Sequence, residues 1–351
     1  MRYDVVVVGG GLAGACAALW LSDSCSVAML EVNEAANAAS GAAAGLVNPI
    51  KGLRATPMWR CKEALEALHR TLEVSGAGHL FRATGVLRPA LDSSQADYFQ
   101  NAAFKYSDQT EWLTHETVCA RYPDVEAPFG GLWIASGGAV SLSAFTLAML
   151  DAAERCGADI YTGARLTGWK ENDRECRVET NGGSFKAKNL LLCLGDGFSA
   201  FPKLTELPLH KIKGQTIRLL KPEALPGDLP AISGGVYIVP DSDELVVGST
   251  FEHDFTHLEP DPELGESLRE KAALLIPSLS DVAIIDQRAG IRVTIPRVRL
   301  PMLGPLPGSK RTWIFTGLGA KGLMTAPLLA RDLAAFLADP KKLPVEVRPP
   351  G

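Results

Sequence analysis

Within the first thirty residues the apolar pattern changes from that of a strand to that of a helix and back to that of a strand. Tyr3–Val8 is rich in β-branched residues and predicts a buried strand. A helix-compatible apolar stretch over Leu12–Leu21 and a second apolar strand over Ser26–Leu30 follow, and the strand ends at Glu31. Between the first strand and the helix stand three glycines in the spacing G-x-G-x-x-G: Gly9, Gly11 and Gly14. This order predicts the phosphate-binding unit of a dinucleotide-binding fold.

Each part of this unit has a physical role. Gly9 allows a tight turn out of the strand, Gly11 lets a pyrophosphate approach the backbone, and Gly14 lets the helix pack closely on the strand. The helix N-terminus presents free N–H groups and a partial positive charge to the phosphates. Glu31 can accept hydrogen bonds from both ribose hydroxyls, which favours FAD or NAD over NADP.

Periodic apolar patterns continue along the rest of the chain. Helical spacing predicts helices over 58–72, 141–156 and 323–337, the second with Ser143 as its N-cap. The continuous run Asn189–Leu194 predicts a buried parallel strand that returns to the nucleotide-binding sheet. Further short apolar runs predict strands at 159–162, 166–170, 176–179, 215–220, 236–239, 244–247 and 312–315. Residues 209–286 are strand-rich, which is typical of an antiparallel sheet in a second domain.

These elements predict an α/β protein with two domains. One is a Rossmann-like nucleotide-binding domain with a parallel sheet, and the other is an α+β domain with an antiparallel sheet. The first is discontinuous and takes residues 1–80, 140–200 and 285–345. The second takes residues 81–139 and 201–284.

Composition narrows the function classes. The 351 residues are 46% apolar and 21% charged, with a net charge of −5, which is typical of a soluble globular protein. This balance predicts no general attraction to nucleic acid or to an anionic membrane, and no apolar run is long enough for a membrane span. The seven cysteines lack a C-x-x-C pair, which predicts buried free thiols in a reducing cytoplasm. His253 and His257 lie four apart in a predicted loop, so we expect no metal site.

A series of separated motifs points, in order along nearly the whole chain, to one family. Besides the N-terminal fingerprint with Glu31, the motifs are Ser40–Gly45, Gly137–Val140, Leu192–Gly195, Lys213–Gln215, Tyr237–Pro240, Val246–Thr250, Ala289–Arg292 and Gly317–Pro327. With these motifs the chain resembles the FAD-dependent amine and amino-acid oxidases of the D-amino-acid oxidase superfamily. Glycine oxidase and the oxidase half of the bifunctional tRNA wobble-uridine-modifying enzyme belong to the same group.

The resemblance implies a cofactor and a reaction. The cofactor is FAD, so the first domain is the FAD-binding domain and the second binds the substrate. The substrate is a small amine or amino acid: a D-amino acid, glycine or an N-substituted glycine. Hydride passes to flavin N5, which leaves an imine, and oxygen as acceptor gives hydrogen peroxide. A tRNA-modifying oxidase, an amine dehydrogenase that feeds a quinone or carrier, and a flavoprotein without enzyme activity stay open as alternatives.

The resemblance also implies roles for individual residues. Arg292 pairs with the substrate carboxylate, Tyr237 lines the substrate pocket, and the N-terminus of the last helix, with Lys321, faces the flavin. A sheet tyrosine and a solvated lysine stay open as the plainer interpretations of Tyr237 and Lys321. The implied FAD contacts are Gly9, Gly11, Gly14, Glu31, Ser40, Gly41, Ala43, Ala44, Gly45, Arg165 through its backbone, Gly195, Gly319, Lys321, Gly322, Leu323 and Met324.

Two local features qualify this assignment. The small-residue segment 35–49 predicts backbone brought close to a flat cofactor, with a tightly packed helix entry as the alternative. After Arg292 the chain departs from glycine oxidase, because Val293 stands where a proline is usual and 295–299 is longer and more basic. The identity of the amine therefore stays open.

Overall fold

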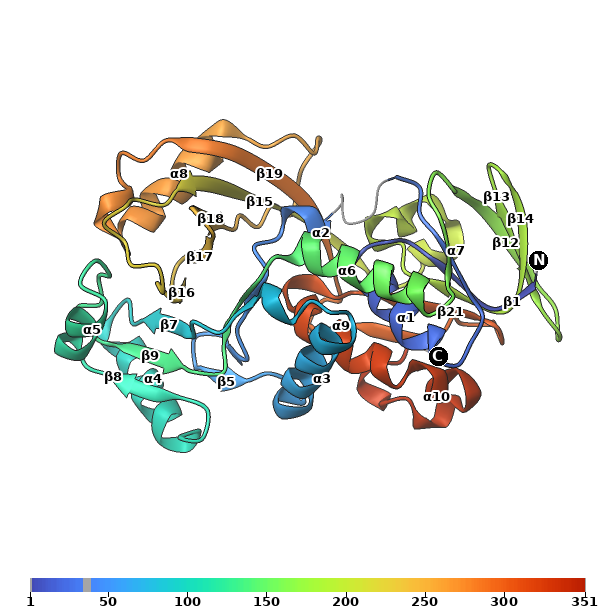
Figure 1. Cartoon of the computed structure of the whole chain (residues 1–351), viewed down its shortest axis with the longest axis horizontal. Coiled ribbons are helices and arrows are strands. Elements are labelled where there is room, and N and C mark those ends of the chain that lie inside the picture. Colours follow the sequence, from blue (N-terminus) through green and yellow to red (C-terminus); the bar gives the residue numbers. More distant parts are fainter. Residues whose placement is uncertain (1, 34–38, 351) are drawn as a thin grey trace.

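Two eight-stranded sheets organise the chain, and each combines strands that are far apart in sequence (Figure 1). The computed structural model describes residues 2–33 and 39–350. The core of the first sheet runs parallel in the order β11 (Asp159–Tyr161), β2 (Val27–Leu30), β1 (Arg2–Val8), β14 (Gly183–Leu192) and β21 (Thr312–Thr316). Three antiparallel strands extend it: β12 (Leu166–Glu171), β13 (Cys176–Thr180) and β20 (Met302–Pro305).

Helices cover one face of this sheet and shorter elements cover the other. Along β1, Val5 and Val7 pack into the helical layer, while Val6 and Val8 pack into the opposite layer. This alternation explains why the strand is apolar at each position from Val5 to Val8. The helical layer consists of α1 (Leu12–Ser22), α3 (Cys61–Val74), α6 (Leu142–Arg155), α9 (Gly322–Arg331) and α10 (Leu333–Ala338). The opposite face is covered by η2 (Gly195–Ala200) and α7 (Pro202–Thr205), and buried residues of the sheet's own antiparallel strands β12 and β13 join the same core cluster.

The second sheet is antiparallel except at one pair of neighbours, β16 and β7. Its order is β19 (Ile284–Thr294), β15 (His210–Leu220), β18 (Glu244–Gly248), β17 (Tyr237–Asp241), β16 (Ala231–Ser233), β7 (Val86–Pro89), β9 (Gly131–Ile134) and β8 (Glu111–Leu113). Helix α8 (Pro262–Ala273) packs on one face through Leu268 and Ala272. Helices α4 (Ser93–Lys105) and α5 (His115–Arg121) lie beside β7–β9 in the left half of Figure 1. The parallel first sheet and largely antiparallel second sheet confirm the predicted fold class.

Short elements complete the chain. Two small sheets pair β3 (Leu46–Val47) and β6 (Phe81–Arg82) with β10 (Gly138–Val140), and β4 (Ile50–Lys51) with β5 (Thr56–Pro57). Helix α2 (Ala39–Ala42) lies near the centre of Figure 1, between the two large sheets. The 3₁₀ helices are η1 (Gly78–Leu80), η3 (Pro277–Leu279), η4 (Gly319–Lys321), η5 (Pro340–Lys342) and η6 (Val345–Val347).

The structure differs from the sequence predictions at several elements. The predicted helix over 323–337 is divided at Asp332 into α9 and α10, and the helix predicted over 58–72 begins only at Cys61. Ser141, not Ser143, is the N-cap of α6. The strand-rich region 209–286 also contains α8, which the strand prediction missed. Residues 285–294, assigned from the sequence to the nucleotide-binding domain, pair with β15 in the second sheet because β19 extends through Thr294.

No helix in the described part of the chain is both long and apolar enough to cross a membrane. All seven cysteines are free thiols. Four of them are buried as predicted, whereas Cys119 and Cys156 are exposed and Cys25 is partly exposed.

Candidate functional site

One long cavity of about 890 Å³ connects the glycine-rich turn after β1 with the second sheet. Its lining includes Arg292 and Tyr237 and most of the residues that the resemblance implies as FAD contacts: Gly9, Gly11, Glu31, Ser40, Ala43, Ala44, Gly45, Arg165, Gly195, Gly319, Lys321, Gly322, Leu323 and Met324. Gly14 and Gly41 do not line it. The fold therefore brings the predicted site residues to one cavity, and their individual roles stay predictions.

The glycine-rich turn is constrained by close backbone contacts. Gly9 has φ +109°, and a Cβ there would lie 2.3 Å from the carbonyl oxygen of Cys193. A Cβ at Gly14 would lie 1.8 Å from the carbonyl oxygen of Gly9, so this glycine lets α1 pack on the turn. At Gly11 a Cβ would meet only the Ser40 hydroxyl, at 3.6 Å. The protein itself leaves room at position 11, which suits close approach of a ligand from the cavity.

The carboxylate of Glu31 closes the nucleotide end of the cavity. It accepts hydrogen bonds from the backbone N–H groups of Gly10 and, at 3.0 Å, Asn33. Nearby, the N–H of Arg165 donates to the Asn181 side chain at 2.8 Å, and its carbonyl accepts from the Asn181 N–H at 3.0 Å. Arg165 thus lines the cavity with its N–H already occupied, and only its carbonyl retains a lone pair for a ligand.

A second glycine-rich helix start faces the same cavity. Between β21 and α9, Gly317 has φ +70° and a Cβ at Gly322 would lie 3.2 Å from Leu12 at the start of α1. The N-caps of α1 and α9 are Gly11 and Lys321, and neither caps its helix through its side chain. The two helix N-termini therefore direct their partial positive charge to one cavity.

Helix α2 connects the first helix with the second sheet. The Ser40 hydroxyl accepts a hydrogen bond from the Leu12 N–H at 3.2 Å. Two carbonyls of α2 accept from the second sheet: Ala42 from the Thr216 hydroxyl at 3.0 Å, and Gly41 from Arg288 at 3.3 Å. Gly45 is required where the chain passes β10, since a Cβ would lie 1.7 Å from the Val140 carbonyl oxygen. Residues 35–38 of the predicted small-residue segment lie outside the described residues.

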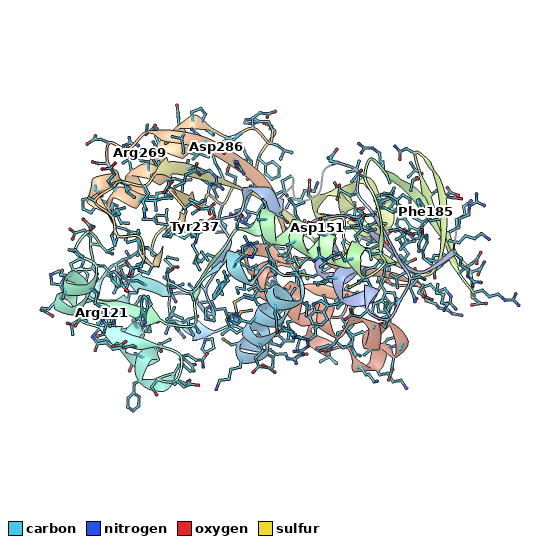
Figure 2. The ribbon with its side chains drawn as sticks, in the orientation of Figure 1. Arg121, Asp151, Phe185, Tyr237, Arg269 and Asp286 are labelled. Carbon is cyan, nitrogen blue, oxygen red and sulfur yellow. The ribbon has the colours of Figure 1, made fainter. Side chains whose placement is uncertain are left out.

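Arg292 and Tyr237 lie together at the other end of the cavity. The Arg292 guanidinium donates to the Ser249 hydroxyl at 2.5 Å and to the Thr250 carbonyl at 3.2 Å. The Tyr237 hydroxyl lies within hydrogen-bonding reach of both Arg292 and Ser249. The guanidinium also lies over the ring of Phe251, 4.8 Å from its centroid. In Figure 2, Tyr237 lies inside the left half of the molecule, whereas Arg121 and Arg269 lie toward its edge.

Two glycines make room for these polar groups. A Cβ at Gly214, on β15, would lie 2.2 Å from Nη1 of Arg292. A Cβ at Gly248, on β18, would lie 2.6 Å from the Tyr237 hydroxyl. The strand pairing places these positions on one face of the second sheet, opposite the face that α8 covers.

The electrostatics of this pair favour an anion. Burial lowers the pKa of Arg292, because it disfavours the charged guanidinium, and the neighbouring Tyr237 opposes this shift. Burial raises the pKa of Tyr237, with Arg292 and Ser249 opposing. Arg292 takes part in none of the ion pairs among the described residues. A buried cation held only by neutral partners stabilises a negatively charged ligand.

Lys321, the N-cap of α9, lies half-buried at the cavity, close to Lys51. Burial, together with the positive charges of Lys51 and Arg299, lowers the pKa of Lys321 to about 8.

In the described part of the chain, no three His, Cys, Asp or Glu side chains gather in a group that could hold a metal ion.

Sequence reasoning missed several residues of this site. Ser249, Thr250, Gly214 and Gly248 hold or accommodate the two polar groups, and all of them lie in motifs that carried the family resemblance without an assigned role. Thr316 also lines the cavity, with a buried hydroxyl that has no hydrogen-bond partner among the described residues. Its place at the end of an apolar strand, before a glycine turn, is the signal that could have identified it.

Comparison with known proteins agrees with this geometry. The family model described as FAD dependent oxidoreductase matches residues 4–336. The chain is 30% identical to a glycine oxidase of Pseudomonas aeruginosa, over 96% of this chain and 95% of that protein. It is 29% identical to the tRNA 5-methylaminomethyl-2-thiouridine biosynthesis bifunctional protein MnmC of the same species, over 98% of this chain and 58% of that protein.

The fold has a counterpart among solved structures. The crystal structure of glycine oxidase from Geobacillus kaustophilus superposes with a TM-score of 0.85, covering 97% of this chain and 96% of that one, at 24% identity. Sequence, fold and cavity together show that this chain belongs to the FAD-dependent oxidoreductases of the D-amino-acid oxidase and glycine oxidase family.

Proposed function

We propose that this enzyme oxidises the C–N bond of a small amino acid or secondary amine that carries a carboxylate: a D-amino acid, glycine or an N-substituted glycine. The observation that carries this proposal is the Arg292 guanidinium, which faces the cavity beside Tyr237 and has only neutral partners among the described residues. A guanidinium offers two parallel N–H donors that match a carboxylate. The similarity to glycine oxidase supports a substrate of this class.

The described cavity fits FAD, the cofactor of this family. Glu31 suits the ribose and the α1 N-terminus suits the pyrophosphate. The buried Thr316 hydroxyl, which has no partner in the described part of the chain, offers a further hydrogen bond in the cavity. Bound FAD supplies the oxidising chemistry by accepting a hydride from the carbon next to the substrate nitrogen. The N-terminus of α9 and Lys321 hold positive potential at the cavity, which stabilises negative charge that develops there.

The remaining residues bind and orient the substrate. Arg292 and the Tyr237 hydroxyl hold the carboxylate, which fixes the amine carbon relative to the rest of the cavity. Among the described lining residues the carboxylates are Glu31 and Asp196, at the nucleotide end, and none is a histidine. We therefore expect the amine to bind in its neutral form, because its proton has no nearby acceptor side chain among these residues.

Replacement of Arg292 tests the proposal. We expect Arg292→Ala to raise KM for a carboxylate substrate about 30-fold or more, because loss of a buried charged partner costs about 2–5 kcal/mol. FAD should stay bound, and Arg292→Lys should recover part of the loss. Arg269→Ala, on α8, outside the cavity lining and paired with Glu266, is the matched control. Unchanged kinetics in Arg292→Ala would overturn the assignment.

The electron acceptor is tested separately. We propose oxygen, with hydrogen peroxide as product. Anaerobic reduction by an amine, followed by rapid reoxidation in air with stoichiometric peroxide, supports this. Slow reoxidation in air that a quinone accelerates would instead favour a dehydrogenase. If no amine in a panel of amino acids and N-alkyl glycines bleaches the flavin absorption, the result would favour a flavoprotein without this activity.

A tRNA-modifying oxidase is the second candidate, because the similarity to MnmC spans 98% of this chain. A carboxymethylaminomethyl group on a wobble uridine is itself an N-substituted glycine, so Arg292 would serve the same carboxylate. Affinity for tRNA that falls steeply with salt would support this candidate.

For the cellular compartment of the protein we propose the cytoplasm, on the basis of the seven free cysteines.

A further inference from the structure

The end of the cavity near Arg292 carries more positive charge than one carboxylate requires. Lys51 and Lys321 both line the cavity, and Lys51 lies close enough for its positive charge to lower the pKa of Lys321. This pair lies close to the strand of Arg292, since a Cβ at Gly319, in η4, would be 3.2 Å from Thr294 at the end of β19. The lining carboxylates of the described residues, Glu31 and Asp196, belong to the nucleotide end.

A buried arginine holds Lys51 in place. Arg88 is only 7% exposed, and it donates to the carbonyls of Ile50 at 3.2 Å and Gly52 at 2.8 Å, on either side of Lys51. Its Nε is buried and has no hydrogen-bond partner among residues 2–33 and 39–350, and its guanidinium lies 4.8 Å from the ring centroid of Phe99. Arg88 also lines the cavity. Besides Arg292, it is therefore a second buried cation of the cavity without an acidic partner among the described residues, and it lies next to Lys51.

The grouping of Lys51, Arg88 and Lys321 at one cavity is unfavourable without an anion. None of the ion pairs in the described part of the chain includes Lys51, Arg88 or Lys321. Like charges that lie close together repel, and the partial burial of Lys51 and Lys321 adds to the cost. The lowered pKa of Lys321 reflects both effects. A negatively charged group bound between these side chains removes the repulsion.

We propose that Lys51 and Lys321 form a second anion subsite, so that the substrate is an amine with two acidic groups. One carboxylate binds Arg292, and the other acidic group binds the two lysines. Acidic D-amino acids and N-carboxyalkyl glycines fit this class. The second acidic group takes no part in bond breaking, since the hydride leaves from the carbon next to nitrogen. This inference rests on the proposed function and narrows it.

A binding measurement tests the subsite without catalysis. Glutarate and butyrate, as a diacid and a monoacid, are titrated into the FAD-loaded enzyme and followed by the perturbation of flavin absorption. We expect glutarate to bind about tenfold more tightly than butyrate, and Lys51→Gln to abolish that difference. Lys51→Arg keeps the charge and should retain it. Lys271→Gln, an exposed lysine on α8, should leave both affinities unchanged.

A kinetic measurement follows the same logic. The ratio of kcat/KM for iminodiacetate to that for N-methylglycine should exceed one in the wild type and fall about tenfold in Lys51→Gln. If neither measurement shows a preference for the diacid, the subsite is overturned. If the oxidation of N-methylglycine still depends on Arg292 in that case, the proposed function stands. If no amine reduces the enzyme, the proposed function fails and the glutarate titration still decides the subsite. If Lys51→Gln weakens tRNA binding and not glutarate binding, the lysines serve RNA phosphates and the proposal is overturned.

Discussion

At Gly214, a hydrogen in place of a side chain decides where Arg292 can lie. The guanidinium occupies the space that a Cβ would fill, with Nη1 and Nη2 at 2.2 and 2.3 Å. Gly248 accommodates the Tyr237 hydroxyl in the same way, at 2.6 Å. The two residues that hold the substrate carboxylate in our proposal thus depend on two neighbouring positions without side chains. A glycine on a strand has positional meaning of this kind where another group approaches closely.

Gly214→Ala tests this dependence. The end of a long side chain moves more easily than backbone, so we expect the fold to persist and Arg292 to be displaced. KM for a carboxylate substrate should rise about tenfold or more, while FAD content and the melting temperature change little. Gly227→Ala is the matched control, because a Cβ there meets no atom within 4 Å. Equal KM values in the two variants would contradict the packing argument.

The charge of Lys321 gives a pH dependence at the residue scale. With a pKa of about 8 in a cluster with Lys51 and Arg299, Lys321 is protonated at pH 7 and loses its charge as pH rises through 8. Glutarate affinity should therefore fall between about pH 7 and 9, and Lys321→Met should remove this inflection. Measurement of glutarate binding across this range checks the expectation. A flat profile in the wild type would show that Lys321 does not contribute charge to the subsite.

At the scale of elements, the segment that follows β18 holds Arg292 from behind. Lys213 is 1% exposed, and its Nζ lies 3.3 Å from the Glu252 carboxylate. The other oxygen of Glu252 accepts from the Thr250 hydroxyl at 2.8 Å, and that hydroxyl accepts from the Gln215 N–H at 2.8 Å. Because the Thr250 carbonyl accepts from Arg292, the ion pair between buried Lys213 and partly exposed Glu252 supports a hydrogen bond on the face of the sheet opposite α8.

Glu252→Gln is expected to weaken this support. It leaves the Lys213 ammonium buried without its charged partner, which costs about 3 kcal/mol of unfolding free energy. KM for a carboxylate substrate should rise severalfold with kcat nearly unchanged, since Arg292 loses its fixed position and not its charge. Glu259→Gln, an exposed carboxylate beside His257, serves as control. A melting temperature that falls while KM stays constant would limit the pair to a structural role.

At the scale of the whole molecule, one cavity is built by both sheets. Its nucleotide end comes from the ends of parallel strands and the helices that follow them, and its substrate end comes from the face of the second sheet opposite α8. Helix α2 bonds to β15 and β19 and also contacts the start of α1 (Figure 1). A ligand that spans the cavity therefore binds both parts at once.

Cofactor binding should for this reason stabilise the whole chain. At 100 times its Kd, FAD adds about 2.7 kcal/mol, which raises the melting temperature of the apoprotein by several degrees, on the order of 5 °C. NADP should give a much smaller shift, because Glu31 at the ribose end repels a 2′-phosphate. Gly9→Ala should abolish the FAD shift, since the added Cβ meets the Cys193 carbonyl oxygen at 2.3 Å. Thermal denaturation with each ligand measures these differences, and equal shifts by FAD and NADP would contradict the role of Glu31.

Local patterns determined the elements that local physics controls. The apolar runs of β1, β2, β14 and β21 predicted strands, and the glycine spacing predicted the turn before α1, because strand burial and glycine conformation depend on near neighbours in the chain. Helix α8 was overlooked although Asp261 and Pro262 form a regular helix start. The break at Asp332 and the full length of β19 were not predicted, since packing and strand pairing decide where such elements end.

The sequence by itself determined the cofactor fold, the family resemblance and the candidate residues at both ends of the cavity. Only the tertiary structure decided which partners these residues have: that Arg292 is held by Ser249 and Thr250, and that Lys51 lies beside Lys321. These contacts join residues tens to hundreds of positions apart, and they depend on the register of β15 against β18 and β19. Long-range pairing of this kind leaves no periodic signal in the chain, because each strand carries the same apolar pattern whichever neighbour it meets.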